Sequence, residues 1–278
     1  MNTVLPAFPA APCRCRQCIA DNWLLLAADD GENAWSGDSR PPAWETLLAW
    51  NGAVPGGVKF VLSPERRVSL RAELPWAEDR DSSGAMAAVT AGFAEARRLW
   101  HQTDASPRIA PLPPAAVLPA PLAQTCLESG WEVNRRADGT LVVGLDVPGG
   151  HWPANLLVLP SNEILALVEL ATIGVGTTAA REAVAMLLLL AGGALRWVRP
   201  AVRAIGDRWA AVFEVLLPSE PTAADLVDAW SGLSLACRWC AAEATALLDA
   251  PAAQEYLRVM APLSVPNLNP QTKAATPW

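Results

Sequence analysis

The sequence has very little lysine, histidine and tyrosine. Only Lys59 and Lys273 are lysines among 21 lysine and arginine residues, while histidine occurs twice and tyrosine once in 278 residues. The formal charge is 21 − 28 = −7, so nucleic-acid binding, which needs a basic surface to displace counterions, is not expected. With 52% apolar and 18% charged residues, the chain has too much hydrophobic material for intrinsic disorder.

Long apolar runs are missing as well. The most apolar stretch, residues 183–195, spans 13 residues and includes two glycines, whereas a helix needs about 20 residues to cross a bilayer. Pro6, Pro9 and Pro12 interrupt the first residues, which also lack the basic start of a signal peptide. We therefore expect a soluble, cytoplasmic protein with no membrane partner.

Catalytic signatures are also lacking. The sequence contains no nucleophile elbow, His-Glu-x-x-His motif or Walker loop. Residues Gly174–Ala179 fit the dinucleotide fingerprint G-x-G-x-x-[GA], but an acidic residue about 20 positions later is missing and the preceding strands look antiparallel. We interpret this segment as a strand-to-helix turn, with nucleotide binding as the alternative, and expect neither enzyme activity nor a cofactor.

The cysteines do not form a convincing metal motif. Cys13, Cys15 and Cys18 offer three thiolates, but a tetrahedral zinc site needs a fourth ligand, and no further cysteine or histidine is near in sequence. Cys237 and Cys240 lie one helical turn apart within an alanine-rich pattern. We expect no disulfide framework and no metal, and we keep a metal centre at the Cys13–Cys18 cluster as an alternative.

The most informative feature is an internal repeat. Cys18–Trp23 resembles Cys126–Trp131 at an offset of 126 − 18 = 108, and Asp-Gly pairs follow both tryptophans at the same offset. A later match, of Leu47 with Leu189, has an offset of 189 − 47 = 142, and Val58–Val61 then resembles Leu195–Val198. We therefore predict two copies in which Trp23 and Trp131 superpose, the first copy lacking about thirty residues after its first hairpin.

Periodicity, turns and caps predict the elements of both copies. Thr177 or Thr178 is the predicted cap of the helix that begins near Thr178, and Pro221 is predicted at the first position of the last helix. In the second copy they are a helix over Leu122–Ser129, a hairpin of Trp131–Arg136 and Leu141–Val147, strands Asn155–Leu159 and Ile164–Ile173, a helix from Thr178 to Gly193, a hairpin of Leu195–Val202 and Trp209–Leu217, and a helix over Thr222–Leu248. In the first copy they are strand Trp23–Ala28, helix Ala43–Trp50, a hairpin of Val58–Val61 and Val68–Leu74, and helix Ser83–Trp100.

This order predicts an α+β fold of two tandem modules, each an antiparallel sheet with helices packed on one face. The predicted divisions are a degenerate module over 1–105, a proline-rich linker over 106–121, a complete module over 122–260 and a flexible tail over 261–278.

The second hairpin of each copy is the candidate partner-binding surface. Alternation along Trp209–Leu217 places one apolar set beneath the helices and leaves a mixed apolar and charged strip on the opposite face. Such a strip suits an added strand or an amphipathic segment, although packing of the modules on each other would cover the same residues. The predicted partner-binding residues are Arg196, Arg199, Val212, Glu214, Leu216, Arg71 and Glu73.

The element order, together with the motifs Cys126–Trp131, Ala137–Gly139 and Glu214–Pro218, resembles the YbjN-like and type III secretion chaperone-like proteins. The resemblance implies a small acidic protein without enzymatic activity that binds extended segments of a partner protein, such as a secreted effector. An acidic or amphipathic segment is suggested separately by the arginines that crowd the two hairpins, with a solvated strand face as the alternative; they are Arg66, Arg67, Arg71, Arg196, Arg199, Arg203 and Arg208. Single-module members often dimerise, so two unequal copies imply a monomeric pseudo-dimer or a homodimer. A structural scaffold subunit, favoured by the thirteen tryptophans, is a further alternative.

Overall fold

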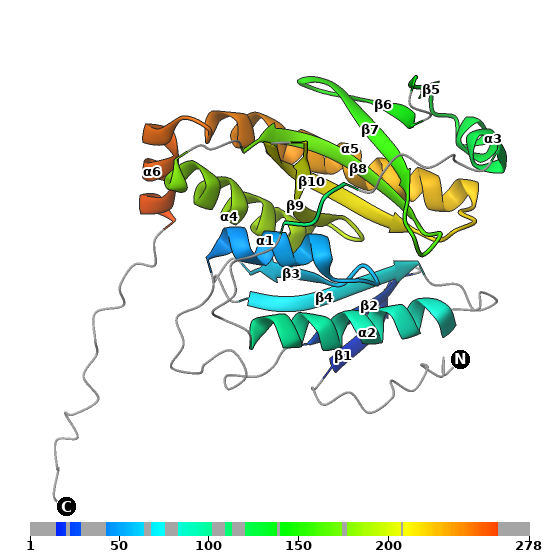
Figure 1. The fold of residues 1–278 in the computed structure, drawn as a ribbon, viewed down its shortest axis with the longest axis horizontal. Helices are drawn as coiled ribbons and strands as arrows, with labels where there is room; N and C mark the ends of the chain where they lie inside the picture. Colours follow the sequence, from blue (N-terminus) through cyan, green and yellow to red (C-terminus); the bar gives the residue numbers. More distant parts are fainter. Residues whose placement is uncertain are drawn as a thin grey trace, which may run out of the picture.

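The fold is known from a computed structural model, which describes residues 15–20, 23–28, 43–63, 68–75, 83–101, 109–112, 120–137, 140–173, 177–206 and 208–260. Over these residues the chain forms two antiparallel sheets and six helices, the α+β architecture that the sequence predicts (Figure 1). None of the helices in these ranges is long and apolar enough to cross a bilayer.

The first half of the chain builds a four-stranded sheet with the strand order β1-β2-β4-β3. The predictions for Trp23–Ala28 and Ser83–Trp100 agree with β2 and α2 residue for residue, whereas the strand containing the cysteine cluster was not predicted. The elements are β1 (Cys15–Ala20), β2 (Trp23–Ala28), α1 (Trp44–Ala53), β3 (Lys59–Leu62), β4 (Val68–Pro75) and α2 (Ser83–Trp100).

The second half builds a six-stranded sheet with the order β5-β6-β7-β8-β10-β9. Its elements are α3 (Ala120–Glu128), β5 (Val133–Arg135), β6 (Leu141–Val147), β7 (Gly150–Val158), β8 (Ile164–Thr172), α4 (Thr178–Ala194), β9 (Arg199–Ile205), β10 (Arg208–Leu217), α5 (Ala223–Ala246) and α6 (Ala250–Val259).

The two sheets share a strand order, but not at the predicted alignment. The order β1-β2-β4-β3 matches β7-β8-β10-β9, with α1 and α2 in the places of α4 and α5. Trp23 opens β2 opposite Pro75, and Ile164 opens β8 opposite Leu217, which gives an offset of 164 − 23 = 141. Trp131 instead precedes the edge strand β5. The prediction that Trp23 and Trp131 superpose is therefore wrong, because strand pairing and not the shared cysteine–tryptophan spacing decides which positions match.

The helices of the second half begin at polar caps that the sequence displays. The Thr177 side chain accepts the Ala180 amide at the start of α4, as one of the two predicted caps. Thr222 and Asp225 form a reciprocal capping box at the start of α5. Pro221 therefore precedes the cap and does not occupy the first helical position that was predicted for it.

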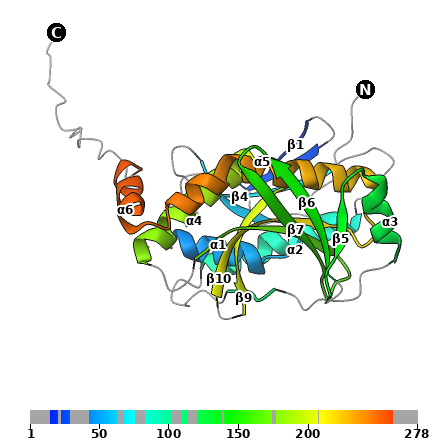
Figure 2. The same cartoon turned by 90° about the horizontal axis from the view of Figure 1, so that it is seen from above.

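The sheets and helices stack in layers (Figure 1). Helix α2 covers one face of the first sheet, and α5 packs on β6, β8 and β10 of the second. Figure 2 shows α5 along the six-stranded sheet, with α6 near one end and α3 near the other. Helices α1 and α4 contact each other between the sheets, and each also contacts the edge strand of the other half, since α1 meets β9 and α4 meets β3.

The edge of β9 is covered from several sides. The Asn51 side-chain amide of α1 donates to Pro200 O at 2.9 Å, and the Leu112 amide donates to Ala204 O at 3.1 Å. Pro200 has no amide hydrogen of its own, which suits an edge position. Covering in this way prevents a second chain from pairing with this edge.

Candidate functional site

The predicted partner-binding strip lies mostly inside the protein. Val212 and Glu214 have no exposed surface and Arg199 is 5% exposed. Glu73 is also buried, Arg71 and Leu216 are half-buried, and only Arg196 is exposed. The alternation itself is correct, because Phe213 and Val212 belong to separate hydrophobic clusters. The expectation of an outer, accessible face is wrong, because α1 of the first half contacts β9 and Leu112 packs against the cluster that contains Val212.

The first half contributes a buried ion pair to the interface. Lys59 Nζ lies 2.7 Å from Glu73 Oε2. The same ammonium group donates to Leu195 O at 2.8 Å and to Val198 O at 3.0 Å, both in the turn that follows α4. Burial lowers the pKa of Lys59, against the opposing effect of Glu73. The lysine therefore stabilises a chain reversal that belongs to the opposite half.

The second half also contributes a buried ionic cluster that binds a backbone carbonyl of the other half. Arg199 Nε and Arg203 Nε donate to the Glu214 carboxylate at 2.7 and 2.9 Å. Arg199 Nη1 also donates to Val54 O at 2.6 Å, in the turn that follows α1. Burial is the largest influence on the Arg199 guanidinium and lowers its pKa. Two cations thus share one carboxylate beneath the first half.

These two clusters act as reciprocal links between the halves. Val54 is the C-cap of α1 and Leu195 is the C-cap of α4, so each cation binds the carbonyl-rich end of the helix in the other half. We call the Lys59–Glu73 pair and the Arg199–Arg203–Glu214 triad the cross-half clasps. Their charged groups bind each other and backbone carbonyls inside the protein. This explains why these strands contain charged residues that are shielded from solvent.

Sequence reasoning missed two residues of this interface. Asn51 in α1 donates to both Phe60 O and Pro200 O, while its own oxygen accepts the Phe60 amide. Lys59 was assigned no role, although a rare lysine flanked by Val58 and Phe60 is a recognisable signal of a buried charge. Asn51 had no comparable signal, since asparagine is common near helix ends.

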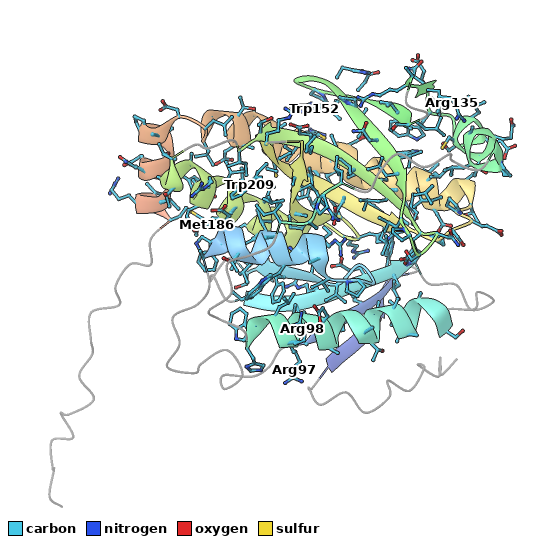
Figure 3. The ribbon with its side chains drawn as sticks, in the orientation of Figure 1. Arg97, Arg98, Arg135, Trp152, Met186 and Trp209 are labelled. Carbon is cyan, nitrogen blue, oxygen red and sulfur yellow. The ribbon has the colours of Figure 1, made fainter. Side chains whose placement is uncertain are left out.

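The opposite ends of α1 and α4 are also linked by polar contacts. Glu182 Oε2 accepts the Trp44 amide at 3.1 Å, and Arg181 Nε lies 3.2 Å from Glu45 Oε2. Figure 3 labels Trp209 beside α4, where the Arg181 guanidinium lies 5.8 Å from the centre of the indole ring. Polar links therefore join the halves at both ends of the central helix pair.

A cavity of about 510 Å³ opens between the two halves. Each half supplies the same three kinds of element to its wall: the turn after the central helix, the end of the second hairpin strand, and the first turn of the closing helix. The described wall residues of this kind are Gly56, Gly57, Leu74, Pro75, Ser83, Gly84 and Ala85 from the first half, and Trp197, Leu216, Leu217 and Asp225 from the second. Neither half forms this cavity alone.

Trp197 occupies an unusual backbone conformation in the cavity wall. Its φ of 59° lies in the left-handed region, which bulky residues rarely adopt. The matched position 197 − 141 = 56 is a glycine with φ of 68°. The Trp197 amide donates to Glu73 Oε2 at 3.0 Å, and its ring meets the Trp23 ring edge-on at 5.3 Å. A residue held in such a conformation by its neighbours is a candidate for a functional role.

The strand predicted over Leu195–Val202 starts later than expected because of this turn. β9 begins at Arg199, and Leu195–Val198 form the reversal that presents carbonyl groups to Lys59. The predicted match of Val58–Val61 with Leu195–Val198 is therefore wrong. Strand pairing instead makes Lys59 of β3 equivalent to Pro200 of β9. Lys59 pairs with Arg71 of β4, and Pro200 pairs with Phe213 at the matching place in β10.

The cysteines with described side chains are poor metal ligands. Cys126, Cys237 and Cys240 are buried and not in disulfides, and burial raises the pKa of these thiols to about 11, 12 and 12. Over the described residues, no group of histidine, cysteine, aspartate and glutamate forms a metal site. The side chains of the Cys13–Cys18 cluster and residues 174–176 of the Gly174–Ala179 turn lie outside the described residues, so both alternatives stay predictions.

No protein-family model matches this chain, and neither a curated protein nor a solved structure matches it.

Proposed function

We propose that this protein is a non-enzymatic binding protein of the chaperone type, which holds an extended segment of a partner protein in the cavity between its two halves. The observation that carries the proposal is the cavity itself, a space of about 510 Å³ walled by matched elements of both halves. That volume is within the range of sites that take small ligands or a few side chains of a peptide.

The wall of the cavity suits an extended chain. Leu74, Leu216 and Trp197 supply apolar and aromatic surface for side chains. The first turn of α2 also lines the cavity.

The element order of the second half supports the same proposal. Helix α3, the strands β5 to β8, helix α4, the hairpin β9–β10 and helix α5 follow the order by which the sequence resembles type III secretion chaperone-like proteins. The first half repeats part of this order, and the cross-half clasps occupy the surface between the repeats. We therefore propose a monomeric pseudo-dimer that acts in the cytoplasm, with a secreted protein as one type of partner.

A blocking variant tests the proposal. Ala85 is exposed on the first turn of α2 and lines the cavity, while Ala87 is exposed on the same helix and is not among the described lining residues. We expect Ala85→Trp to reduce the affinity for extended model peptides at least about tenfold, because an indole would fill part of the space that the segment occupies. Ala87→Trp is the matched control and should bind as the unmodified protein does.

The probes are fluorescein-labelled ten-residue peptides rich in glycine and serine, with a central residue between two leucines, and binding is measured by fluorescence anisotropy. Circular dichroism melts of both variants verify that each is folded. If none of the peptides binds the unmodified protein, or if both tryptophan variants bind equally well, the proposed function is refuted.

A further inference from the structure

We infer that the segment bound in the cavity carries a basic side chain between apolar residues, so that the site selects for positive charge as well as for hydrophobicity. This inference rests on the proposed function and names the chemistry of its ligand. It also reverses the charge expected from the sequence, where the arginine-rich hairpins pointed to an acidic partner.

The described wall of the cavity carries charge of one sign. Its ionisable residues are Glu73, Glu163 and Asp225, and neither lysine nor arginine occurs among the wall residues that the structure describes. The arginines that motivated the acidic partner lie elsewhere, because Arg199 and Arg203 are 5% exposed and bound to Glu214. The accessible charge at the cavity is therefore negative.

Two of the three carboxylates are already satisfied by the protein. Glu73 pairs with Lys59 and accepts the Trp197 amide. Asp225 is 3% exposed and accepts the amide and the hydroxyl of Thr222, both at 2.9 Å. These carboxylates shape the wall and set its potential, but their charges have partners or helix-end donors.

Glu163 is the carboxylate that remains available. It lies half-buried at the start of β8, and the Ser161 hydroxyl donates to its Oε2 at 2.8 Å. Among the described residues Glu163 forms no direct ion pair, and its charge acts only through space on the buried Arg199 guanidinium, which binds Glu214. A half-buried carboxylate in the cavity wall that has no cation in direct contact favours a cation from the ligand.

Trp197 supplies a second feature that points to a cation. Trp197 forms part of the wall, and its backbone is held at a φ where the first half uses glycine. An indole face attracts a guanidinium or ammonium group most strongly among the aromatic side chains. The apolar wall formed by Leu74 and Leu216 then accommodates the flanking residues. A tryptophan and a carboxylate in the same wall thus complement a basic residue between apolar ones.

The experiment compares three peptides that differ only in the central residue: arginine, its neutral isostere citrulline, and glutamate. We expect the arginine peptide to bind roughly fivefold tighter than the citrulline peptide, and the glutamate peptide to bind weakest. The preference for arginine should shrink as salt rises, since a partly exposed charge pair is screened.

Two charge variants assign the preference to the cavity. Glu163→Gln should lower the affinity for the arginine peptide to that of the citrulline peptide, and should leave the citrulline peptide unaffected. Glu132→Gln removes an exposed carboxylate that is not among the described wall residues and should preserve the preference.

The outcomes separate this inference from the proposed function. If citrulline or glutamate peptides bind as tightly as the arginine peptide, or if Glu163→Gln leaves the preference intact, the assignment of charge is overturned. In that case a loss of binding in Ala85→Trp would still support the cavity as the site. If Ala85→Trp binds all three peptides normally, the cavity is not the site and both conclusions fail.

Discussion

Replacing Lys59 by methionine tests whether the cross-half clasps hold the two halves together. Methionine keeps much of the aliphatic length but removes the ammonium group, which is 2.7 Å from Glu73 Oε2 and donates to Leu195 O and Val198 O. Breaking a buried ion pair by removing one partner destabilises a protein by about 3–5 kcal/mol. We expect a loss of this size in the free energy of unfolding, since the carboxylate and both carbonyls lose a donor.

The measurement is urea-induced unfolding followed by circular dichroism, with the slope of the transition compared between variants. The double variant Lys59→Met with Glu73→Gln should lose less than the sum of the single losses, because the neutral amide no longer leaves a buried charge unpaired. Arg98→Met, in the solvent-exposed pair with Glu95, is the control and should change stability only slightly. A loss below about 1 kcal/mol in Lys59→Met would refute the assigned role.

The same residue predicts a pH dependence with a defined sign. Burial lowers the pKa of Lys59 below its ordinary value of 10.5. Between the lowered pKa and 10.5, the unfolded chain holds more protons on this lysine than the folded chain, so its contribution to stability rises with pH. The difference in unfolding free energy between the unmodified protein and Lys59→Met should therefore increase with pH in that window. A difference that falls there would contradict the predicted direction of the pKa shift.

Two further predictions concern the cavity turn and the cysteines. Gly56→Ala should lower the melting temperature far more than Gly57→Ala. Both glycines have positive φ, but a Cβ at Gly56 would lie 2.3 Å from Ala88 O, whereas one at Gly57 meets nothing within 4 Å. Equal melting temperatures of the two variants would contradict the packing at this turn. Cys126, Cys237 and Cys240 should resist alkylation at pH 8 in the folded protein and react after unfolding, because burial raises the pKa of these thiols to about 11, 12 and 12. Peptide mapping by mass spectrometry measures the labelling, and rapid labelling of the native thiols would contradict the prediction.

Local pattern was a good guide to single elements. A short apolar run predicted β2 at its observed bounds, and a long helical pattern predicted α2. The cap of α4 was predicted at Thr177 or Thr178, whereas Thr222, the cap of α5, was placed inside its helix. These features depend on interactions within a few residues, so the sequence displays them directly.

Pairing between distant segments was harder to predict. The shared spacing from Cys18 to Trp23 and from Cys126 to Trp131 looked like a repeat, yet Trp23 lies in a strand that pairs with β4 and Trp131 precedes an edge strand. The register of a strand pair depends on many hydrogen bonds and side-chain contacts between the strands, and a few identical residues in two segments do not predict it.

The sequence by itself determined the fold class, most of the elements and the two faces of each hairpin, because hydrophobic periodicity and turn residues act locally. Only the tertiary structure decided which face meets solvent. Glu214 and Arg199 were predicted on an accessible face, but both are buried, as is Lys59. Partner charges and helix-end carbonyls compensate these groups for lost hydration. Whether a charged side chain is buried depends on which distant residues supply its ion-pair and hydrogen-bond partners. The cavity, likewise, forms only where the two halves pack together.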